Sequence, residues 1–169
     1  SAALSRYKKH LRDMEANLPI PEAHKNFQRG FESPIAVAEQ VHGGGDNVPG
    51  SQTIAFNLPN DERVREAKGA KKVILSNVLG AKYERILSPM AQLVLKPDQA
   101  KLVSKKYMQL ETLFHELSHS LGPGTIVVNG RKTRVDAELK EQSSGLEEAK
   151  ADVAGAWNLL YMMRLKELP

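Results

Sequence analysis

One apolar stripe limits what this chain can fold into more than any other feature of its sequence. In the segment 97–121, large apolar residues recur every three or four positions: Val103, Tyr107, Leu110, Phe114, Leu117 and Leu121. This spacing predicts a long helix that buries one face. Gly122 and Pro123 follow directly, as is typical after the end of a helix.

A second stripe of the same period predicts a partner helix over 144–167. We expect the members of this stripe to face the core: Leu146, Ala149, Val153, Ala156, Leu160 and Met163. Shorter elements are predicted elsewhere, namely helices over 4–17, 34–41, 61–68 and 79–93, a strand over 52–59, a strand or buried helix over 71–79, and a turn at Asn129-Gly130. We expect residues 1–169 to form a single domain that is mainly α-helical with a few short β-strands.

Composition excludes several classes of function. The chain of 169 residues contains no cysteine, so disulfides and thiolate metal sites are impossible. No apolar run approaches the roughly 20 residues of a membrane span and no signal peptide is visible, so we expect no membrane partner and a cytoplasmic location. The net charge is only +4 and aromatic residues are not interleaved with the basic ones, which argues against a nucleic-acid partner.

The two ends of the sequence indicate a segment of something longer. The chain opens with Ser-Ala-Ala, without a methionine, and stops just after a helical pattern. Processing could give the same start. We expect other domains of a longer parent chain as partners.

The first long helix carries the run His115-Glu116-Leu117-Ser118-His119. Residues four apart lie on the same face of a helix, so the two imidazoles project together at the edge of the apolar stripe. Two histidines at this spacing can bind one zinc ion, with Glu116 beside the ion as a candidate general base. The alternative is a chance match on an ordinary amphipathic helix.

The second long helix offers the third ligand that a catalytic zinc usually takes. Glu148 and Asp152 are also four apart. We expect Glu148 to bind the metal and Asp152 to hydrogen-bond the far nitrogen of a ligand histidine. Small residues surround them and would let the two helices approach closely: Ala149, Ala151, Ala154, Gly155 and Ala156. The alternative is a solvated acidic face, but together the two motifs favour a zincin-like site with the metal held between two helices.

Five stretches, two of which contain the motifs above, carry a recognisable pattern. They are NLPIPEAHKNF (17–27), AFNLPNDERVRE (55–66), GAKKVILSNVLGAKYE (69–84), LFHELSHSLGPG (113–124) and LEEAKADVAG (146–155). In this order they resemble segments of the dipeptidyl-peptidase III family of zinc metallopeptidases. The zinc motif is most similar to that of short-motif members, which include proteins fused to a nudix domain.

The resemblance implies a role for each matched residue of the metal site. The implied ligands of the Zn²⁺ ion are His115, His119 and Glu148. Glu116 would be the catalytic glutamate, and the flanking acids Glu147 and Asp152 would support the site. The implied activity is the removal of dipeptides from the amino ends of oligopeptides.

The resemblance also implies substrate contacts outside the two long helices. Asn57 and Asn60 match asparagines that hold the amino-terminal end of the peptide substrate. Without the family, the same two residues would be a strand end and a turn residue.

The chain departs from the family in ways that favour two rival functions. The usual zinc motif of the family is one residue longer between its histidines, and later segments that act on substrate and transition state have no counterpart here. The first rival is a catalytically weak or inactive zinc-binding domain that serves as a peptide-binding or regulatory module. The second rival is a generic zincin endopeptidase without preference for the amino end, against which Asn57 and Asn60 argue.

Overall fold

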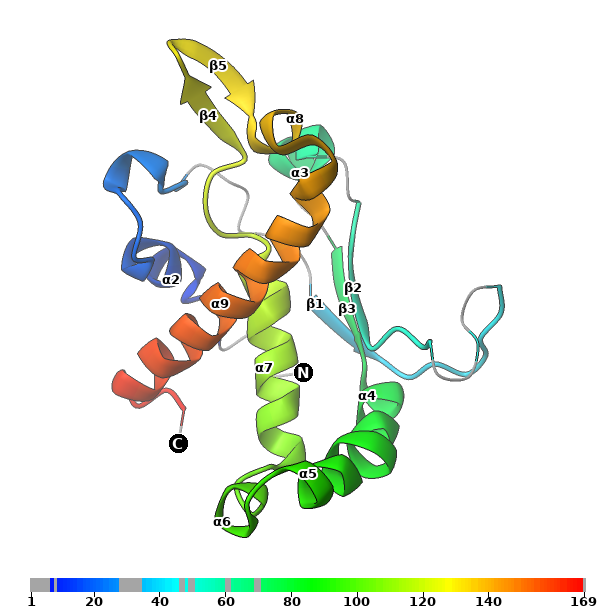
Figure 1. Ribbon diagram of the computed structural model, residues 1–169. Coiled ribbons are helices and arrows are strands. Elements are labelled where there is room, and N and C mark those ends of the chain that lie inside the picture. The colour runs from blue at the N-terminus through cyan, green and yellow to red at the C-terminus, as the bar shows by residue number, and fades with distance from the viewer. Residues whose placement is uncertain are drawn as a thin grey trace.

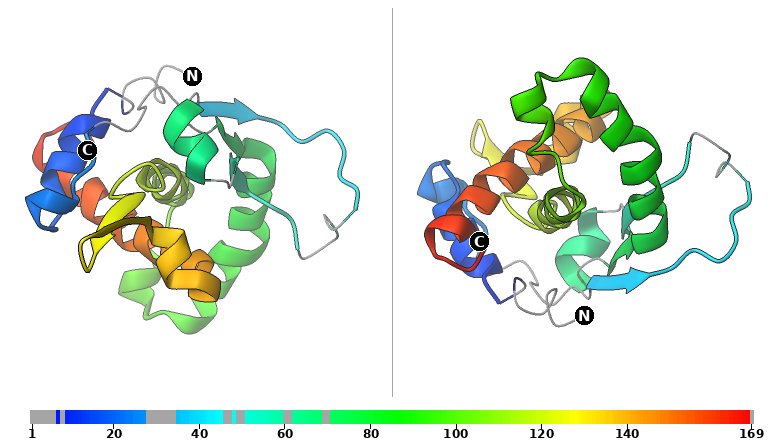
Figure 2. Two further views of the ribbon diagram at one scale, coloured as in Figure 1. Left: turned by 90° about the horizontal axis from the view of Figure 1, so that it is seen from above. Right: turned by 90° about the horizontal axis from the view of Figure 1, so that it is seen from below.

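The computed structural model is mostly helical with short strands, which confirms the predicted fold class (Figure 1). Its two longest helices, α7 (Lys105–Ser118) and α9 (Ser143–Arg164), cross each other, and a small sheet lies beside α7. Two further views show α7 near the middle of the molecule, seen almost along its axis (Figure 2). The structure describes residues 7, 9–27, 35–45, 48, 51–59, 62–68 and 71–168.

Helix α7 begins and ends through local signals in the sequence. The hydroxyl of Ser104 accepts a hydrogen bond from the Tyr107 amide at 3.3 Å and caps the first turn. Past the helix, Gly122 has a φ of +78°, a left-handed conformation that glycine adopts without a steric penalty. The predicted stripe is buried at Phe114, Leu117 and Leu121 but leaves Tyr107, at the start of the helix, exposed.

Helix α9 packs on α7 with a face that the sequence pattern did not predict. Its buried residues are Ala151, Gly155, Asn158 and Met162. The prediction that the stripe of Leu146, Val153 and Leu160 faces the core is wrong, because these side chains are exposed. The helix is apolar on two sides, and the side with the smallest residues allows the closest approach to α7.

Gly155 marks the point of closest approach between the two helices. A Cβ atom on this residue would lie 3.0 Å from the backbone nitrogen of His115 and 3.2 Å from its Cα. No side chain fits there without a shift of one helix. The crossing therefore fixes the carboxylates of α9 against the histidines of α7.

Among the described residues, the three-stranded sheet has the order β1-β3-β2, which places β2 at an edge. Strands β1 (Ile35–Ala38) and β3 (Lys71–Leu75) are parallel, and β2 (Ala55–Leu58) is antiparallel to β3. The helix predicted over 34–41 is wrong, because the β-branched residues of this segment pair with β3 instead. The ambiguous segment 71–79 divides into β3 and the start of the helix α4 (Ser76–Lys82).

The other elements connect and cover these two layers. The predicted helix over 97–121 is interrupted at 101–104, and the turn at Asn129-Gly130 joins two strands with positive φ at both residues. The remaining elements are α2 (Leu11–Asn17), η1 (Glu22–His24), α3 (Glu62–Lys68), η2 (Tyr83–Leu87), α5 (Ser88–Val94), α6 (Pro97–Ala100), β4 (Thr125–Val128), β5 (Arg131–Arg134), α8 (Val135–Leu139) and η3 (Lys140–Gln142). In the part of the chain that the structure describes, no helix has both the length and the apolarity to span a membrane.

The core lies where α2, α7 and α9 meet. It includes Met14, Phe114, Leu117 and Met162, all without solvent exposure. Glu15 is also fully buried, and its two carboxylate oxygens accept the backbone N–H groups of Asn26 at 2.7 Å and Gly122 at 2.8 Å. This carboxylate ties α2 to the loop that follows α7.

Candidate metal centre

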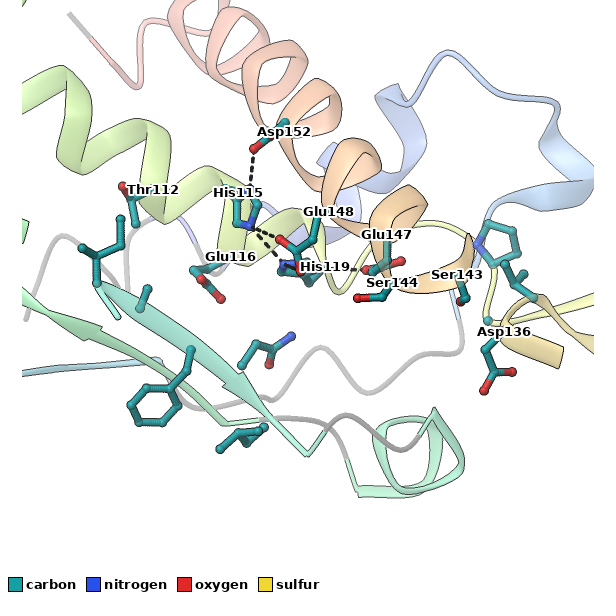
Figure 3. A pocket seen from close by; sticks show the side chains of 18 of the residues that line it. Thr112, His115, Glu116, His119, Asp136, Ser143, Ser144, Glu147, Glu148 and Asp152 are labelled. Atoms are coloured by element: carbon teal, nitrogen blue, oxygen red, sulfur yellow. Dashed lines mark hydrogen bonds and ion pairs between the residues drawn. The ribbon is translucent and has the colours of Figure 1, made fainter. Parts of the chain in front are cut away.

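Of the two predicted ligand histidines, His115 lies on the last turn of α7 and His119 directly follows the helix as its C-cap, and both face α9 (Figure 3). His115 and His119 are mostly buried, with 18% and 8% of their side chains exposed. Their Nε2 atoms are 3.1 Å apart, and the rings stand edge to face. The helical spacing therefore brings both distal nitrogens to one point.

Glu148 of α9 reaches the same point from the other helix. One carboxylate oxygen lies 3.2 Å from His115 Nε2, and the other lies 3.7 Å from His119 Nε2. The three ligand atoms of these residues all lie within 4.8 Å of one another. Two imidazole nitrogens and one carboxylate are a donor set that zinc binds in catalytic sites.

A second layer of carboxylates holds the far side of each imidazole ring. Asp152 Oδ1 lies 2.7 Å from His115 Nδ1, and Glu147 Oε1 lies 2.8 Å from His119 Nδ1. Lys150 donates to Glu147 Oε1 at 2.9 Å and to the Leu121 carbonyl at 3.0 Å. Burial alone would raise the pKa of Glu147, but hydrogen bonds and charge from His119 and Lys150 outweigh it and lower the pKa to about 2.

The contacts at Nδ1 decide which nitrogen of His115 and of His119 carries the proton, and so whether the residues fit a metal. A carboxylate can only accept at Nδ1, so each neutral ring carries its proton on Nδ1 and its lone pair on Nε2. The two lone pairs and the Glu148 carboxylate then face one another across distances of 3.1–3.7 Å. Such an arrangement is repulsive unless a cation lies between the groups, so the residues fit a divalent metal.

Glu116 lies beside this cluster, between α7 and the sheet (Figure 3). Only 6% of the residue is exposed, and its Oε2 atom has no hydrogen-bond partner among the described residues. Burial raises the pKa of this carboxyl group, and the charges of His119, His115 and Lys72 oppose the shift. A buried acid with an unused oxygen is a suitable acceptor for a proton that arrives during a reaction.

An open cleft of about 860 Å³ leads to the histidines and Glu116. One wall is the strand β2, and the opposite wall consists of α7 and the first turns of α9. Asn57 of β2 lines the cleft, and its buried Oδ1 has no hydrogen-bond partner among the described residues. Asn60, the second predicted substrate residue, lies outside the described residues.

Two charged residues near the site were missed by reasoning from the sequence. Glu111 lines the cleft one turn before His115, and burial raises the pKa of its carboxyl group. The spacing of four residues from His115 was a signal that could have identified it. Lys72 of β3 is 1% exposed and donates to Ser120 Oγ at 2.6 Å, and nothing in its local sequence distinguished it from an exposed lysine.

Comparison with solved structures decides the relationship of the chain. It matches the structure of DPP III from Caldithrix abyssi with 53% identity and a TM-score of 0.90 over 99% of its own length. It matches dipeptidyl-peptidase III from Corallococcus sp. strain EGB with 41% identity and a TM-score of 0.92, also over 99%. The chain is a relative of dipeptidyl-peptidase III. Its fold is therefore peptidase-like.

The chain corresponds to only part of each of these dipeptidyl-peptidase III structures. It covers 32% of the Caldithrix abyssi chain and 31% of the Corallococcus chain. It is also 38% identical over 164 residues to Nudix hydrolase 3 from Arabidopsis thaliana, which is 96% of this chain but 21% of the plant protein. The name of that plant protein describes a different kind of hydrolase. No family model matches the sequence.

Proposed function

We propose that this chain carries the catalytic centre of a zinc metallopeptidase of the dipeptidyl-peptidase III type, which removes dipeptides from the amino ends of oligopeptides. The observation that supports the proposal most is the convergence of His115 Nε2, His119 Nε2 and the Glu148 carboxylate beside the buried Glu116. We take residues 1–169 as one domain of a longer parent chain.

In this proposal, His115, His119 and Glu148 hold the zinc ion. Asp152 and Glu147 accept the Nδ1 protons of the two rings, which keeps Nε2 available and fixes the ring orientation. When bound, zinc acts as a Lewis acid on the scissile carbonyl and lowers the pKa of a bound water towards about 7.

Glu116 is the proposed general base. Its unpaired oxygen accepts a proton from the attacking water and then delivers it to the nitrogen of the leaving amine. The raised pKa of Glu116 suits this transfer, because a carboxylate that was a very weak base could not take the proton from water. Burial among α7 and the sheet keeps bulk water from competing for the same oxygen.

Strand β2 is the proposed binding surface for the substrate backbone. It is the edge of its sheet on the side that lines the cleft, so an extended peptide can add to it through main-chain hydrogen bonds. The unpaired Oδ1 of Asn57 is an acceptor suited to the ammonium group at the peptide's amino end. Asn60 is proposed to share this role on the basis of the family resemblance.

The main alternative is a zinc-binding domain that binds peptides without turning them over. It is favoured by one observation, that the chain spans less than a third of the Caldithrix abyssi and Corallococcus structures. A second hydrolase activity is suggested by the name of the plant relative.

A peptidase assay on a longer parent chain tests the proposal. Oligopeptides with free amino ends should yield dipeptides, whereas the same peptides with blocked amino ends should remain intact. Glu116→Gln should abolish the cleavage without loss of zinc, while the exposed control Glu84→Gln should leave both unchanged. Equal cleavage of blocked peptides would favour a generic endopeptidase, and cleavage of neither kind would favour the binding module.

A further inference from the structure

Helix α9 has two apolar faces, and the described residues cover only one of them. The face with Ala151, Gly155 and Met162 packs on α7. At 100° per residue, the centre of the other apolar face lies almost opposite to this buried face. We call it the outer stripe, and its members are Leu146, Ala149, Val153, Ala156, Trp157, Leu160 and Met163.

The outer stripe is open to solvent along its whole length. Val153 is 71% exposed and Leu160 is 57% exposed. The first and last members, Leu146 and Met163, are 17 positions apart, which corresponds to about 26 Å of helix. In Figure 1, α9 lies in front of α7 with its outer side towards the viewer, and no described element crosses it.

The members of the outer stripe are apolar, so their side chains gain little from contact with water. Arg164 lies at its end, and its guanidinium carbon is 5.8 Å from the centre of the Trp157 ring. Trp157 itself donates its indole N–H to the Asn17 carbonyl at 2.9 Å, which fixes the ring at the border of the stripe. A contiguous apolar patch of this kind usually marks a contact surface, and a helix that is apolar on opposite sides usually lies between two layers.

The relatives indicate which part of a longer protein covers the outer stripe. The fold of this chain superposes with a TM-score of 0.90 or more on proteins of which it covers 31–32%. Those proteins therefore hold an equivalent of α9 within a chain about three times as long. The large and small members of the stripe alternate, with Ala149 and Ala156 between larger side chains, which offers grooves to the ridges of another helix.

We propose that the outer stripe of α9 is the docking surface for a helical segment of the remaining dipeptidyl-peptidase III polypeptide in the parent chain. The inference rests on the proposed longer parent and does not depend on zinc or on catalysis. The docked segment presents an apolar face of about 26 Å to α9. The docked segment would contact the outer stripe of α9, while the opposite face of α9 stays packed against α7.

The test compares one substitution in two settings. Val153→Glu is introduced into this chain alone and into a chimera in which this chain replaces the matching third of the Caldithrix abyssi protein. The chain alone should keep its melting temperature within about 2 °C, because a surface glutamate costs little. The chimera should lose about 5 °C or more, because the same carboxylate is then buried without a partner.

Val127→Glu is the matched control, since Val127 is 68% exposed and lies on the β4–β5 hairpin away from α9. It should change the melting temperature by less than about 3 °C in both settings. If the chimera does not fold, the residue of the full-length Caldithrix abyssi protein that superposes on Val153 is changed to glutamate instead, with the same expected loss.

Two results overturn the docking proposal. One is a melting temperature that Val153→Glu leaves unchanged in the longer protein. The other is a dimer of the isolated chain that Val153→Glu converts to monomers, as measured by light scattering, because the stripe would then bind a second copy. Neither readout uses peptidase activity, so a failure of the proposed function would be seen separately.

Discussion

Each histidine of the candidate metal centre is held by a carboxylate at its Nδ1 atom. The Nδ1 contacts to Asp152 and Glu147 are 2.7 and 2.8 Å, and both Nε2 atoms face Glu148. A ring fixed in this way cannot turn its Nδ1 to the metal. The acids of the second layer therefore set the tautomer, and their removal should be visible in the affinity for metal.

Asp152→Asn should weaken zinc binding by roughly 10–100-fold while the fold survives, because asparagine keeps the shape of the side chain but not its charge. Competition with a chelator of known affinity measures the effect, and circular dichroism reports the fold. The control is Asp98→Asn, an exposed acid on α6. An affinity equal to that of the control would show that Asp152 is only a surface charge.

The spacing of residues on two helices allowed the convergence of most of the candidate metal-site side chains to be predicted. His115, His119, Glu148 and Asp152 follow from spacings of four along the chain, and the structure brings these residues together. The role of Glu147 came only from the family resemblance. Lys72 could not be found, because its burial depends on how β3 packs under the end of α7.

At the scale of elements, the crossing of α7 and α9 brings together two groups of side chains that are about 30 residues apart in sequence. The crossing depends on Gly155, whose position would put a Cβ 3.0 Å from the His115 backbone nitrogen. The backbone of a helix cannot yield as a flexible side chain can. Any side chain at this position therefore separates the carboxylates of α9 from the histidines.

Gly155→Ala should lower the free energy of unfolding by about 1–3 kcal/mol, as overpacking of a tight contact does. It should also weaken zinc binding by about tenfold, because the ligands no longer meet at one point. Denaturant unfolding and chelator competition measure the two effects.

Gly145→Ala is the matched control on the same helix, because nothing lies within 4 Å of an added Cβ there. It should leave zinc binding unchanged and raise stability slightly, since alanine favours a helix over glycine. Equal effects of the two substitutions would mean that the close crossing does not govern the site.

Elements were predicted well where local signals agreed with packing and wrongly where they did not. Gly122 and Pro123 predicted where α7 ends, but its start was placed too early, because the cap at Ser104 was not recognised and the predicted helix began at 97. The segment 34–41 was predicted as a helix because Pro34 can start one, but pairing with β3 decided for a strand. The apolar stripe of α9 was real, but periodicity could not tell which of two apolar faces meets α7.

At the scale of the whole molecule, the cleft needs parts of the chain that are far apart. Its walls come from β2, α7 and the start of α9, and the candidate metal ligands lie between them (Figure 3). The related dipeptidyl-peptidase III structures are about three times as long. This chain contains the proposed metal ligands and the proposed general base Glu116. The remaining parts of such longer proteins can add contacts to the substrate and the transition state.

The isolated chain should bind zinc but cleave dipeptides from free amino ends much more slowly than a longer parent protein. Loss of one preorganised donor to the transition state commonly costs about 10²–10³ in rate, so the isolated chain should be slower by at least this factor. Assays of both proteins on the same peptide measure the ratio. Equal rates would show that the residues of the chain suffice.

Zinc stoichiometry tests the central claim most directly. The purified chain is loaded with zinc, freed of unbound metal and measured by elemental analysis, beside a variant with His115→Ala and Glu148→Ala. The proposed centre predicts about one equivalent of zinc for the chain and almost none for the variant, since a site that has lost two of its three protein ligands cannot hold the ion. Less than about a tenth of an equivalent in the unmodified chain, or equal zinc in the variant, would contradict a metal centre formed by His115, His119 and Glu148.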